Sequence, residues 1–285
     1  MMALLASLFW GGNVVALKIS LASFGPLWAA WWRFALGVVV LTAWAGIRRA
    51  RLRPDWREAR PLLIIGVLFA AQILLLNIGV SFTSPGYAVV MINAHPLFSN
   101  LIGHFLASEE RLSPARVTGL AIAFAGVCYL ALGQPVEELA SNPLLGNWLI
   151  IVSAFLLGIR TVYTRLVVQS VDPMKSVVWQ TGFALPFFLV PALLFEPPLA
   201  GPLTTGALLA LLYQGAIVSS VSFIIWFRLL KRHAAGSIAV FAFLIPFEGI
   251  ALSALLFGEP VTGRMVLAAA MSTLGIAIVT RSQGR

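Results

Sequence analysis

The sequence predicts an all-α integral membrane protein with ten transmembrane helices in two inverted five-helix repeats. Three observations support this fold class. Hydrophobic residues make up 60% of the chain and charged residues only 10%, whereas charged residues are about a quarter of an ordinary soluble domain. The apolar residues fall into runs long enough to cross a bilayer as a helix, which takes about 20 residues. Particular residues also recur in the second half of the chain at a nearly constant offset.

The ten predicted spans are joined by short links, and no soluble domain fits between them. The first run continues through Asn13 without a basic start or a clear cleavage site, so we interpret it as a span rather than a signal peptide. The longest links are Arg48–Arg60 and Gly133–Leu145. The predicted spans are Ala3–Ile19, Leu27–Ile47, Pro61–Val80, Tyr87–Leu106, Ala115–Leu132, Gly146–Val168, Ser176–Leu194, Thr204–Phe227, Ser237–Phe257 and Met265–Thr280.

Lys and Arg are distributed unevenly over the links. With the N-terminus placed in the cytoplasm, fifteen of them fall in the even-numbered links and the C-terminal tail, and only Lys18 and Arg264 fall on the other side. An excess of basic residues marks cytoplasmic links, so both termini are predicted to be cytoplasmic. The net charge of +9 then reports orientation in the membrane, and no nucleic-acid partner is expected.

The two halves of the chain repeat one another. Three residues recur 150 positions later and four recur 147 positions later. Each half holds five spans, an odd number, so the second half must be inverted relative to the first, as in many secondary transporters. The predicted division is a repeat at 1–133, an external link at 134–145 and a repeat at 146–285. The matching residues are Gly86 with Gly236, Pro96 with Pro246, Glu109 with Glu259, Gly11 with Gly158, Lys18 with Arg165, Pro26 with Pro173 and Trp32 with Trp179.

Two prolines lie within predicted spans at matching positions, Pro96 and Pro246. A proline inside a helix removes one backbone donor and crowds the carbonyl one turn earlier, which for Pro96 is that of Ile92, so the helix must kink or open. In lipid the freed carbonyl needs a partner, so such a kink is tolerated only beside other protein or a wet cavity. Paired kinks at membrane depth therefore predict a transporter's binding site.

Several segments carry a family pattern. Trp10–Leu41 (WGGNVVALKISLASFGPLWAAWWRFALGVVVL), Ser84–Leu132 with its PLF and EERLS, and Ile245–Gly263 (IPFEGIALSALLFGEPVTG) resemble the EamA type of the drug/metabolite transporter superfamily, and within it the bacterial amino-acid exporters. The resemblance covers essentially the whole chain. It implies ten helices, inverted five-helix repeats, a bacterial inner membrane and a central substrate cavity. The second half departs from the pattern, with Glu248 where the first half has Phe98.

Ionisable residues inside spans are functional candidates, because burying a charge in a bilayer is costly. Arg160 could bind the carboxylate of a zwitterion, and Glu248 could bind its ammonium. Lys18 lies near a span end and can reach the surface with its long side chain. Arg33 lies about two turns inside its span, where either a substrate or a lipid headgroup is within reach. His95 is either a ligand of the substrate or a histidine hydrogen-bonded within the helix bundle.

The other candidates are polar and aromatic residues within the spans. Tyr87, Met91 and His95 recur at helical spacing on one face, and Trp10 and Asn13 share a face at i and i+3, as do Arg160 and Tyr163. Amides and hydroxyls can also simply join helices in lipid, so that interpretation stays open for each. The predicted substrate-binding residues are Trp10, Asn13, Gln72, Asn77, Tyr87, Met91, His95, Arg160, Tyr163, Trp179, Gln180, Tyr213, Gln214, Phe241 and Glu248.

The predicted function is export of amino acids and related small metabolites by alternating access. A carrier of nucleotide sugars or phosphate esters is the rival within transporters, and it would need more cavity-facing cations. An enzyme is disfavoured, because the chain has no H-E-x-x-H, no G-x-S-x-G and no clustered ligands. A helper or receptor subunit stays open. The single cysteine, Cys128, gives no disulfide or metal framework. We expect a small-molecule substrate and membrane lipid as partners, no cofactor and no metal, while the oligomeric state stays open.

Overall fold

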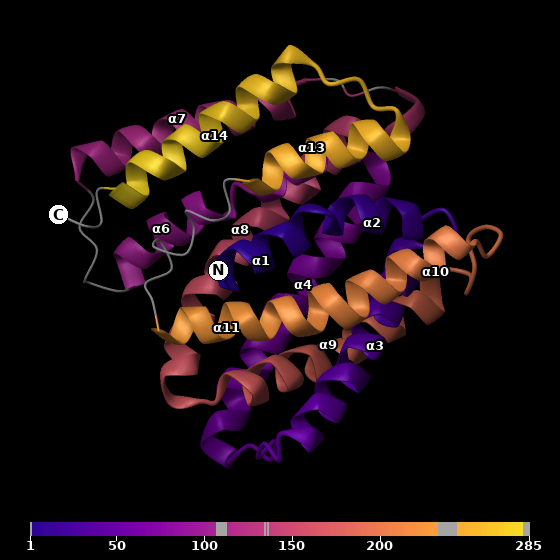
Figure 1. The fold of residues 1–285 in the computed structure, drawn as a ribbon, viewed down its shortest axis with the longest axis vertical. Coiled ribbons are helices and arrows are strands. Elements are labelled where there is room, and N and C mark those ends of the chain that lie inside the picture. Colours follow the sequence, from indigo (N-terminus) through magenta and orange to yellow (C-terminus); the bar gives the residue numbers. More distant parts are fainter. Residues whose placement is uncertain (1, 107–112, 134, 136, 233–243, 282–285) are drawn as a thin grey trace.

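A computed structural model describes residues 2–106, 113–133, 135, 137–232 and 244–281 (Figure 1). Every secondary-structure element among these residues is helical, which confirms the predicted all-α class. The elements are α1 (Met2–Gly11), α2 (Asn13–Ser20), α3 (Pro26–Ile47), α4 (Trp56–Phe82), α5 (Pro85–Ile92), α6 (His95–Leu106), α7 (Pro114–Ala131), the short η1 (Glu137–Leu139), α8 (Pro143–Ser170), α9 (Pro173–Phe195), α10 (Thr205–Leu212), the π-helical η2 (Tyr213–Ser222), α11 (Phe223–Arg232), α13 (Leu244–Phe257) and α14 (Gly263–Arg281).

Six of the described helical stretches are long and apolar enough to cross a membrane, judged by length and composition. They are α3, α4, α7, α8, α9 and the continuous run of α10, η2 and α11. The first predicted span is divided into α1 and α2 at Gly12, and the fourth into α5 and α6. The ninth corresponds to α13, and its predicted first residues, from Ser237, lie outside the described residues.

The fourth span is interrupted just before Pro96. Helix α5 ends at Ile92, and α6 begins at His95. The ring nitrogen Nδ1 of His95 lies 3.2 Å from the Ile92 carbonyl oxygen, which is the oxygen that a proline at position 96 leaves without a backbone donor. The histidine side chain therefore takes the place of the missing N–H. For Pro246 only the side following Leu244 is described, so a matching kink there stays a prediction.

The first helix of each predicted repeat packs against the fourth helix of the other. On α1, a β-carbon at Gly11 would overlap the carboxylate of Glu248 on α13. On α8, a β-carbon at Gly158 would lie 2.6 Å from Cβ of Phe98 on α6. Gly158 stands at the repeat position of Gly11, and Glu248 at that of Phe98. Each glycine thus permits its helix to approach the fourth helix of the other repeat closely, and the two contacts are equivalent.

The second and third helices cross between the repeats in the same way. A β-carbon at Gly66 of α4 would lie 3.3 Å from the Gln180 carbonyl oxygen of α9, and one at Gly215 of η2 would lie 2.8 Å from the Arg33 carbonyl oxygen of α3. The last helices, α7 and α14, lie side by side (Figure 1). These reciprocal contacts are what a two-fold relation between the halves requires.

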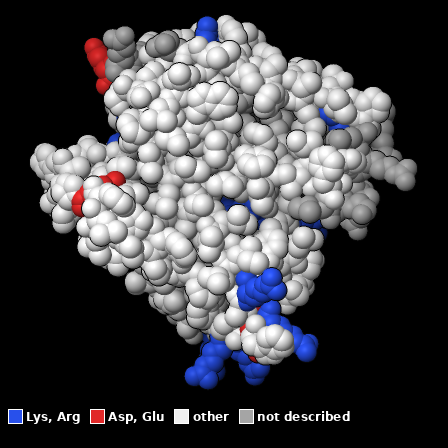
Figure 2. Space-filling view, turned by 180° about the vertical axis from the view of Figure 1, so that it is seen from behind, with Lys and Arg blue, Asp and Glu red and all other residues white. Residues whose placement is uncertain are grey.

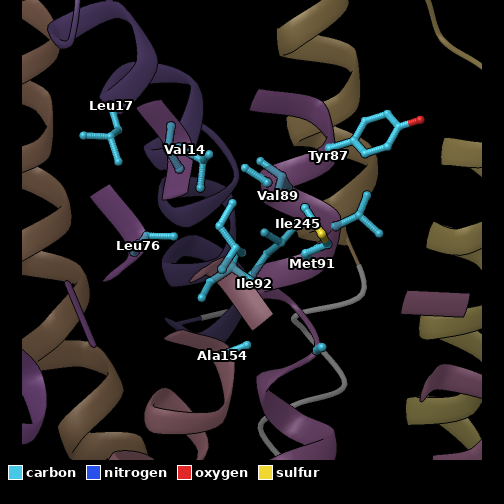
Figure 3. Packing of buried hydrophobic residues seen from close by; sticks show 14 of the residues in the cluster. Val14, Leu17, Leu76, Tyr87, Val89, Met91, Ile92, Ala154 and Ile245 are labelled. Carbon is cyan, nitrogen blue, oxygen red and sulfur yellow. The ribbon is translucent and has the colours of Figure 1, made fainter. Parts of the chain in front are cut away.

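The core consists mainly of aliphatic and small residues from both halves, with Phe24, Trp28 and Tyr87 among them. Figure 3 shows Val14 of α2, Leu76 of α4, Val89 and Ile92 of α5 and Ile245 of α13 converging on one region. Large apolar side chains such as those on the outer faces of α9 and α10 remain exposed. Exposed apolar surface of this kind suits a protein whose surroundings are lipid.

Basic side chains gather at one end of the molecule. Figure 2 shows Lys and Arg at the lower end, where Figure 1 places the α3–α4 link. The link is fastened to α9 by Trp179 Nε1, which donates to the Leu52 carbonyl oxygen at 2.5 Å, and the first turn of α4 is fastened to α9 by Lys175, which pairs with Glu58 at 2.8 Å. The exposed arginines of this region are Arg48, Arg49, Arg51, Arg53, Arg57 and Arg60.

Candidate functional site

A cavity of about 100 Å³ lies between helices of both halves. A space of this size holds several water molecules or part of a small solute. Its wall is mainly apolar and aromatic, with a few polar groups, as in most small-molecule sites. The lining residues are Trp10, Asn13, Val14, Arg33, Gln72, Ile73, Leu76, Val89, Ile92, Asn93, His95, Leu157, Arg160, Thr161, Val218, Ser219, Phe223, Trp226, Phe227 and Ile245.

Two arginines supply the charge of the cavity wall. Arg33 of α3 is only 2% exposed, and its Nη1 donates to Oε1 of Gln214 at 2.8 Å. Arg160 of α8 is half-buried, and its Nη1 donates to Oε1 of Gln180 at 3.3 Å. Both glutamines are fully buried. Each guanidinium is thus held from behind by a neutral amide, which fixes its position without neutralising its charge.

The two guanidinium groups rest on one aromatic cluster. The Arg33 guanidinium carbon lies 4.3 Å from the ring centre of Phe34, and that of Arg160 lies 4.8 Å from the ring centre of Phe69. The rings of Phe34 and Phe69 are themselves 4.8 Å apart, and Phe69 and Phe223 are 5.7 Å apart. Cations are attracted to aromatic faces, so this cluster keeps both charges at the cavity wall.

No carboxylate is positioned to neutralise these charges within the described part of the chain. The lining contains neither Asp nor Glu. The ion pair of Lys175 with Glu58 involves neither arginine. Nε of Arg33 is buried without a hydrogen-bond partner. A buried, unpaired cation in a membrane protein is costly, which indicates that an anionic group of a ligand is expected here.

Two amide oxygens in the cavity wall also lack partners. They are Oδ1 of Asn13 and Oε1 of Gln72, both buried. The Gln72 side chain is held in place, because its Nε2 donates to Ser153 Oγ at 3.0 Å and that hydroxyl donates to the Gln72 carbonyl oxygen at 2.8 Å. Buried polar atoms are nearly always hydrogen-bonded, so these acceptors are available to a donor on a ligand.

Aromatic residues form another part of the wall. Trp10 packs edge to face with Trp226 at a ring distance of 4.8 Å and with Phe223 at 6.5 Å. His95 joins the lining next to the interruption of the fourth span. The cavity therefore combines cations, free acceptors and an apolar surface.

Five of the predicted site residues line the cavity: Trp10, Asn13, Gln72, His95 and Arg160. Behind them, Gln180 and Gln214 hold the two arginines.

Three predicted site residues join helices or links instead. Asn77 Nδ2 donates to the Pro26 carbonyl oxygen at 2.9 Å, and Trp179 bonds to the Leu52 carbonyl oxygen. The Tyr213 hydroxyl donates to the Phe9 carbonyl oxygen at 2.5 Å.

Four of the five remaining predicted residues lie apart from the cavity. Tyr87 and Met91 are packed in the core, and Figure 3 shows the Tyr87 hydroxyl pointing away from the other labelled side chains. Tyr163 packs against a separate small cluster. Glu248 lies against Gly11, with its Oε2 buried and without a partner. Phe241 lies outside the described residues.

Some cavity residues were missing from the predicted site. Arg33 is one of them, because its position about two turns inside the predicted span also allows contact with a lipid headgroup. Ser219, Phe223, Trp226 and Phe227 follow one another at i, i+4, i+7 and i+8, the spacing of one helix face. That stripe was a usable signal. Asn93 and Thr161 gave none, since a lone amide or hydroxyl in a span most often joins helices.

Comparison with known proteins gives a consistent result. The sequence model of the EamA-like transporter family matches residues 1–132 and 144–281. An "Uncharacterized transporter" of Archaeoglobus fulgidus is 30% identical over 85% of this chain and 83% of its own length. A "Probable amino-acid metabolite efflux pump" of Escherichia coli (strain K12) is 28% identical over 97% of this chain and 93% of its own length.

One solved crystal structure has the same fold. It superposes with a TM-score of 0.73 at 23% sequence identity, covering 98% of this chain and 96% of its own. Together with the family match, this confirms the predicted ten-helix fold with inverted repeats.

Proposed function

Because this chain belongs to the EamA-like transporter family, it is a multi-pass membrane transporter and not an enzyme, and we propose that it exports amino acids and related small metabolites through the cavity between its two repeats. The relative named as a probable amino-acid metabolite efflux pump supports this substrate class. We assign the cavity-lining residues Trp10, Asn13, Gln72, His95 and Arg160 to the binding site, and add Arg33.

The observation that carries the proposal is the cationic cavity without an acid in its lining. Arg160 presents a guanidinium, whose fork of N–H donors matches a carboxylate. An amino acid also carries an ammonium, which needs acceptors. The free oxygens of Asn13 and Gln72 can supply these, so they take the role that the sequence suggested for Glu248. The surrounding Trp10 and Trp226 would accept apolar side chains of varied shape.

Movement of substrate would occur by alternating access. The crossed packing of first helix on fourth, and of second on third, joins the repeats through glycine contacts that small rigid-body shifts can preserve. The interruption between α5 and α6 lies at the cavity, where α5 and α6 can tilt separately. Export also requires an orientation, and we propose cytoplasmic termini in a bacterial inner membrane from the excess of arginines in the α3–α4 link.

A second candidate function is transport of phosphate esters such as nucleotide sugars. One observation favours it, namely that Arg33 joins Arg160 in the lining. The cavity thus has two cations, whereas the sequence left open whether Arg33 faces a substrate or a lipid headgroup. Phosphate groups bind well to paired guanidiniums. The phosphate groups themselves carry no ammonium for Asn13 and Gln72, however, whereas an amino acid brings a charged donor next to its acidic group, and this places amino acids first.

Flux through the purified protein in liposomes tests the proposal. Vesicles loaded with a panel of amino acids, and separately with phosphate esters, are assayed for efflux with and without a pH gradient. We expect saturable amino-acid efflux that Arg160→Gln lowers at least ten-fold. Arg228→Gln, on the exposed face of α11, is the matched control and should keep its activity. Efflux of phosphate esters alone would replace the proposal with its rival, and no saturable flux of either class would refute both.

A further inference from the structure

Resting on the amino-acid transport proposed above, we infer that the preferred substrate carries two acidic groups and one ammonium, as an α-amino dicarboxylic acid does. The cavity wall offers two cations and two acceptors without hydrogen-bond partners. A cavity with these four groups accepts a narrower range of amino acids than a cavity with Arg160 alone would.

The first step is the charge of the cavity wall. A guanidinium stays protonated in proteins and has five N–H donors. Arg33 donates a hydrogen bond to the neutral amide of Gln214, and Arg160 donates one to that of Gln180. Both therefore keep a full charge and have donors to spare in the cavity wall, and Nε of Arg33 is buried with no partner.

The second step is the proximity of the two cations. Arg33 lies over Phe34, Arg160 lies over Phe69, and these two rings touch at 4.8 Å between their centres. Two like charges on one partly buried aromatic cluster repel each other more strongly than they would in bulk water. A single carboxylate would neutralise one guanidinium and leave the other uncompensated. A ligand with two acidic groups neutralises both.

The third step separates amino dicarboxylates from other dianions. Asn13 Oδ1 and Gln72 Oε1 are acceptors without donors. A plain dicarboxylate or a phosphate ester at neutral pH has no ammonium to offer them, and leaving a buried acceptor unsatisfied costs free energy. An α-amino dicarboxylate satisfies the arginines with its carboxylates and the amides with its ammonium. Its net charge is also opposite in sign to that of the cavity.

The experiment compares substrates that differ in charge and hardly in size. L-glutamate is paired with L-glutamine and L-aspartate with L-asparagine in the liposome efflux assay, with succinate as a dianion lacking the ammonium. We expect at least ten-fold higher kcat/KM for each acid than for its amide, and little flux of succinate. Arg33→Gln should bring the acid-to-amide ratio of kcat/KM close to one, because the loss of the second cation falls on the acids, whereas the control Arg228→Gln should leave the ratio unchanged.

The outcomes distinguish this inference from the function on which it rests. If glutamine and other neutral amino acids are carried as well as glutamate, or if Arg33→Gln lowers both equally, the inference is wrong and the proposed function stands. If no amino acid is carried, both fail. Thermal stabilisation of the unmodified protein in detergent by glutamate but not by glutamine gives a second readout that needs no variant, and equal shifts for the two would overturn the inference.

Discussion

Lys18 and Arg33 are two cations within the helical bundle whose surroundings differ. Lys18 Nζ donates to three carbonyl oxygens, those of Val80, Thr83 and Leu139, at 2.8–3.0 Å. All three donors of an ammonium are then used, so its role is to join the end of α4 to the link that follows α7. Arg33 has donors to spare and faces a cavity. The number of donors left over, more than depth in the membrane, separates a structural cation from one that can bind a ligand.

Glu248 is a residue whose charge we expect to matter outside the cavity. Its Oε2 is buried without a partner against Gly11, and a carboxylate in a span is costly to keep unless it serves the transport cycle, here by exchanging a proton. Glu248→Gln keeps the size of the side chain, so the contact of α1 with α13 should survive while efflux falls several-fold. Liposome efflux at several pH values measures this.

Glu138→Gln is the control, since this side chain is exposed in η1. Thermal unfolding in detergent should be the same for both variants and the parent. If Glu248→Gln folds and transports like the parent at every pH, the glutamate only joins two helices.

At the level of elements, the N-termini of α5 and α3 are each capped by a glutamate that lies far away in the sequence. The N-terminus of α5 is capped by Glu259, whose Oε2 accepts from Gly86 N at 3.0 Å and from the Ser253 hydroxyl. Glu196 caps α3 in the same manner, accepting from the backbone N–H groups of Leu27 and Trp28. Negative charge at a helix N-terminus is favourable, and here it also holds two parts of the chain together.

Removing the cap of α5 should therefore destabilise the folded protein. Glu259 is 3% exposed, and hydrogen bonds to a charged group are worth about 1.5–3 kcal/mol each, so Glu259→Ala should cost on the order of 2–3 kcal/mol. The expected result is a clear drop in the unfolding temperature in detergent. Glu138→Ala removes an exposed carboxylate and should leave it unchanged. An unaltered unfolding temperature for Glu259→Ala would mean that the cap contributes nothing.

For the molecule as a whole, the spans and the repeat could be predicted because each depends on local information. Hydropathy identifies an apolar run from its own residues, with no information about the helices that pack against it. The constant offsets between matching glycines and prolines reveal the two halves. The pair Trp10 and Asn13 could also be predicted, since residues at i and i+3 of a helix share a face. Both line the cavity, although the span is divided between them at Gly12.

The rest of the site depends on how each helix is rotated, which the sequence does not state. Asn77 and Gln72 lie in one helix, yet Gln72 faces the cavity and Asn77 bonds to Pro26. The stripe of Tyr87, Met91 and His95 assumed one continuous helix. The interruption between α5 and α6 changes the helical phase, so that His95 reaches the cavity while the other two remain in the core.

The orientation of the whole molecule in the membrane follows from the charge of the α3–α4 link. The exposed arginines of the α3–α4 link have a single acidic neighbour pair, Asp55 and Glu58, and both acids are used, Asp55 in capping α4 and Glu58 in bonding Lys175. The cluster therefore keeps its positive charge, and such a segment is retained on the cytoplasmic side. The link after α7 should then be external.

Single cysteines placed in these two links report their sides. In a Cys128→Ala background, Ser141→Cys should react with a membrane-impermeant maleimide added to intact cells, and Ala59→Cys should react only after the membrane is permeabilised. Ser141 is exposed and Ala59 partly so, which makes both accessible once the reagent reaches their side. Labelling of Ala59→Cys alone in intact cells would invert the topology, and with it the direction of every step proposed for export.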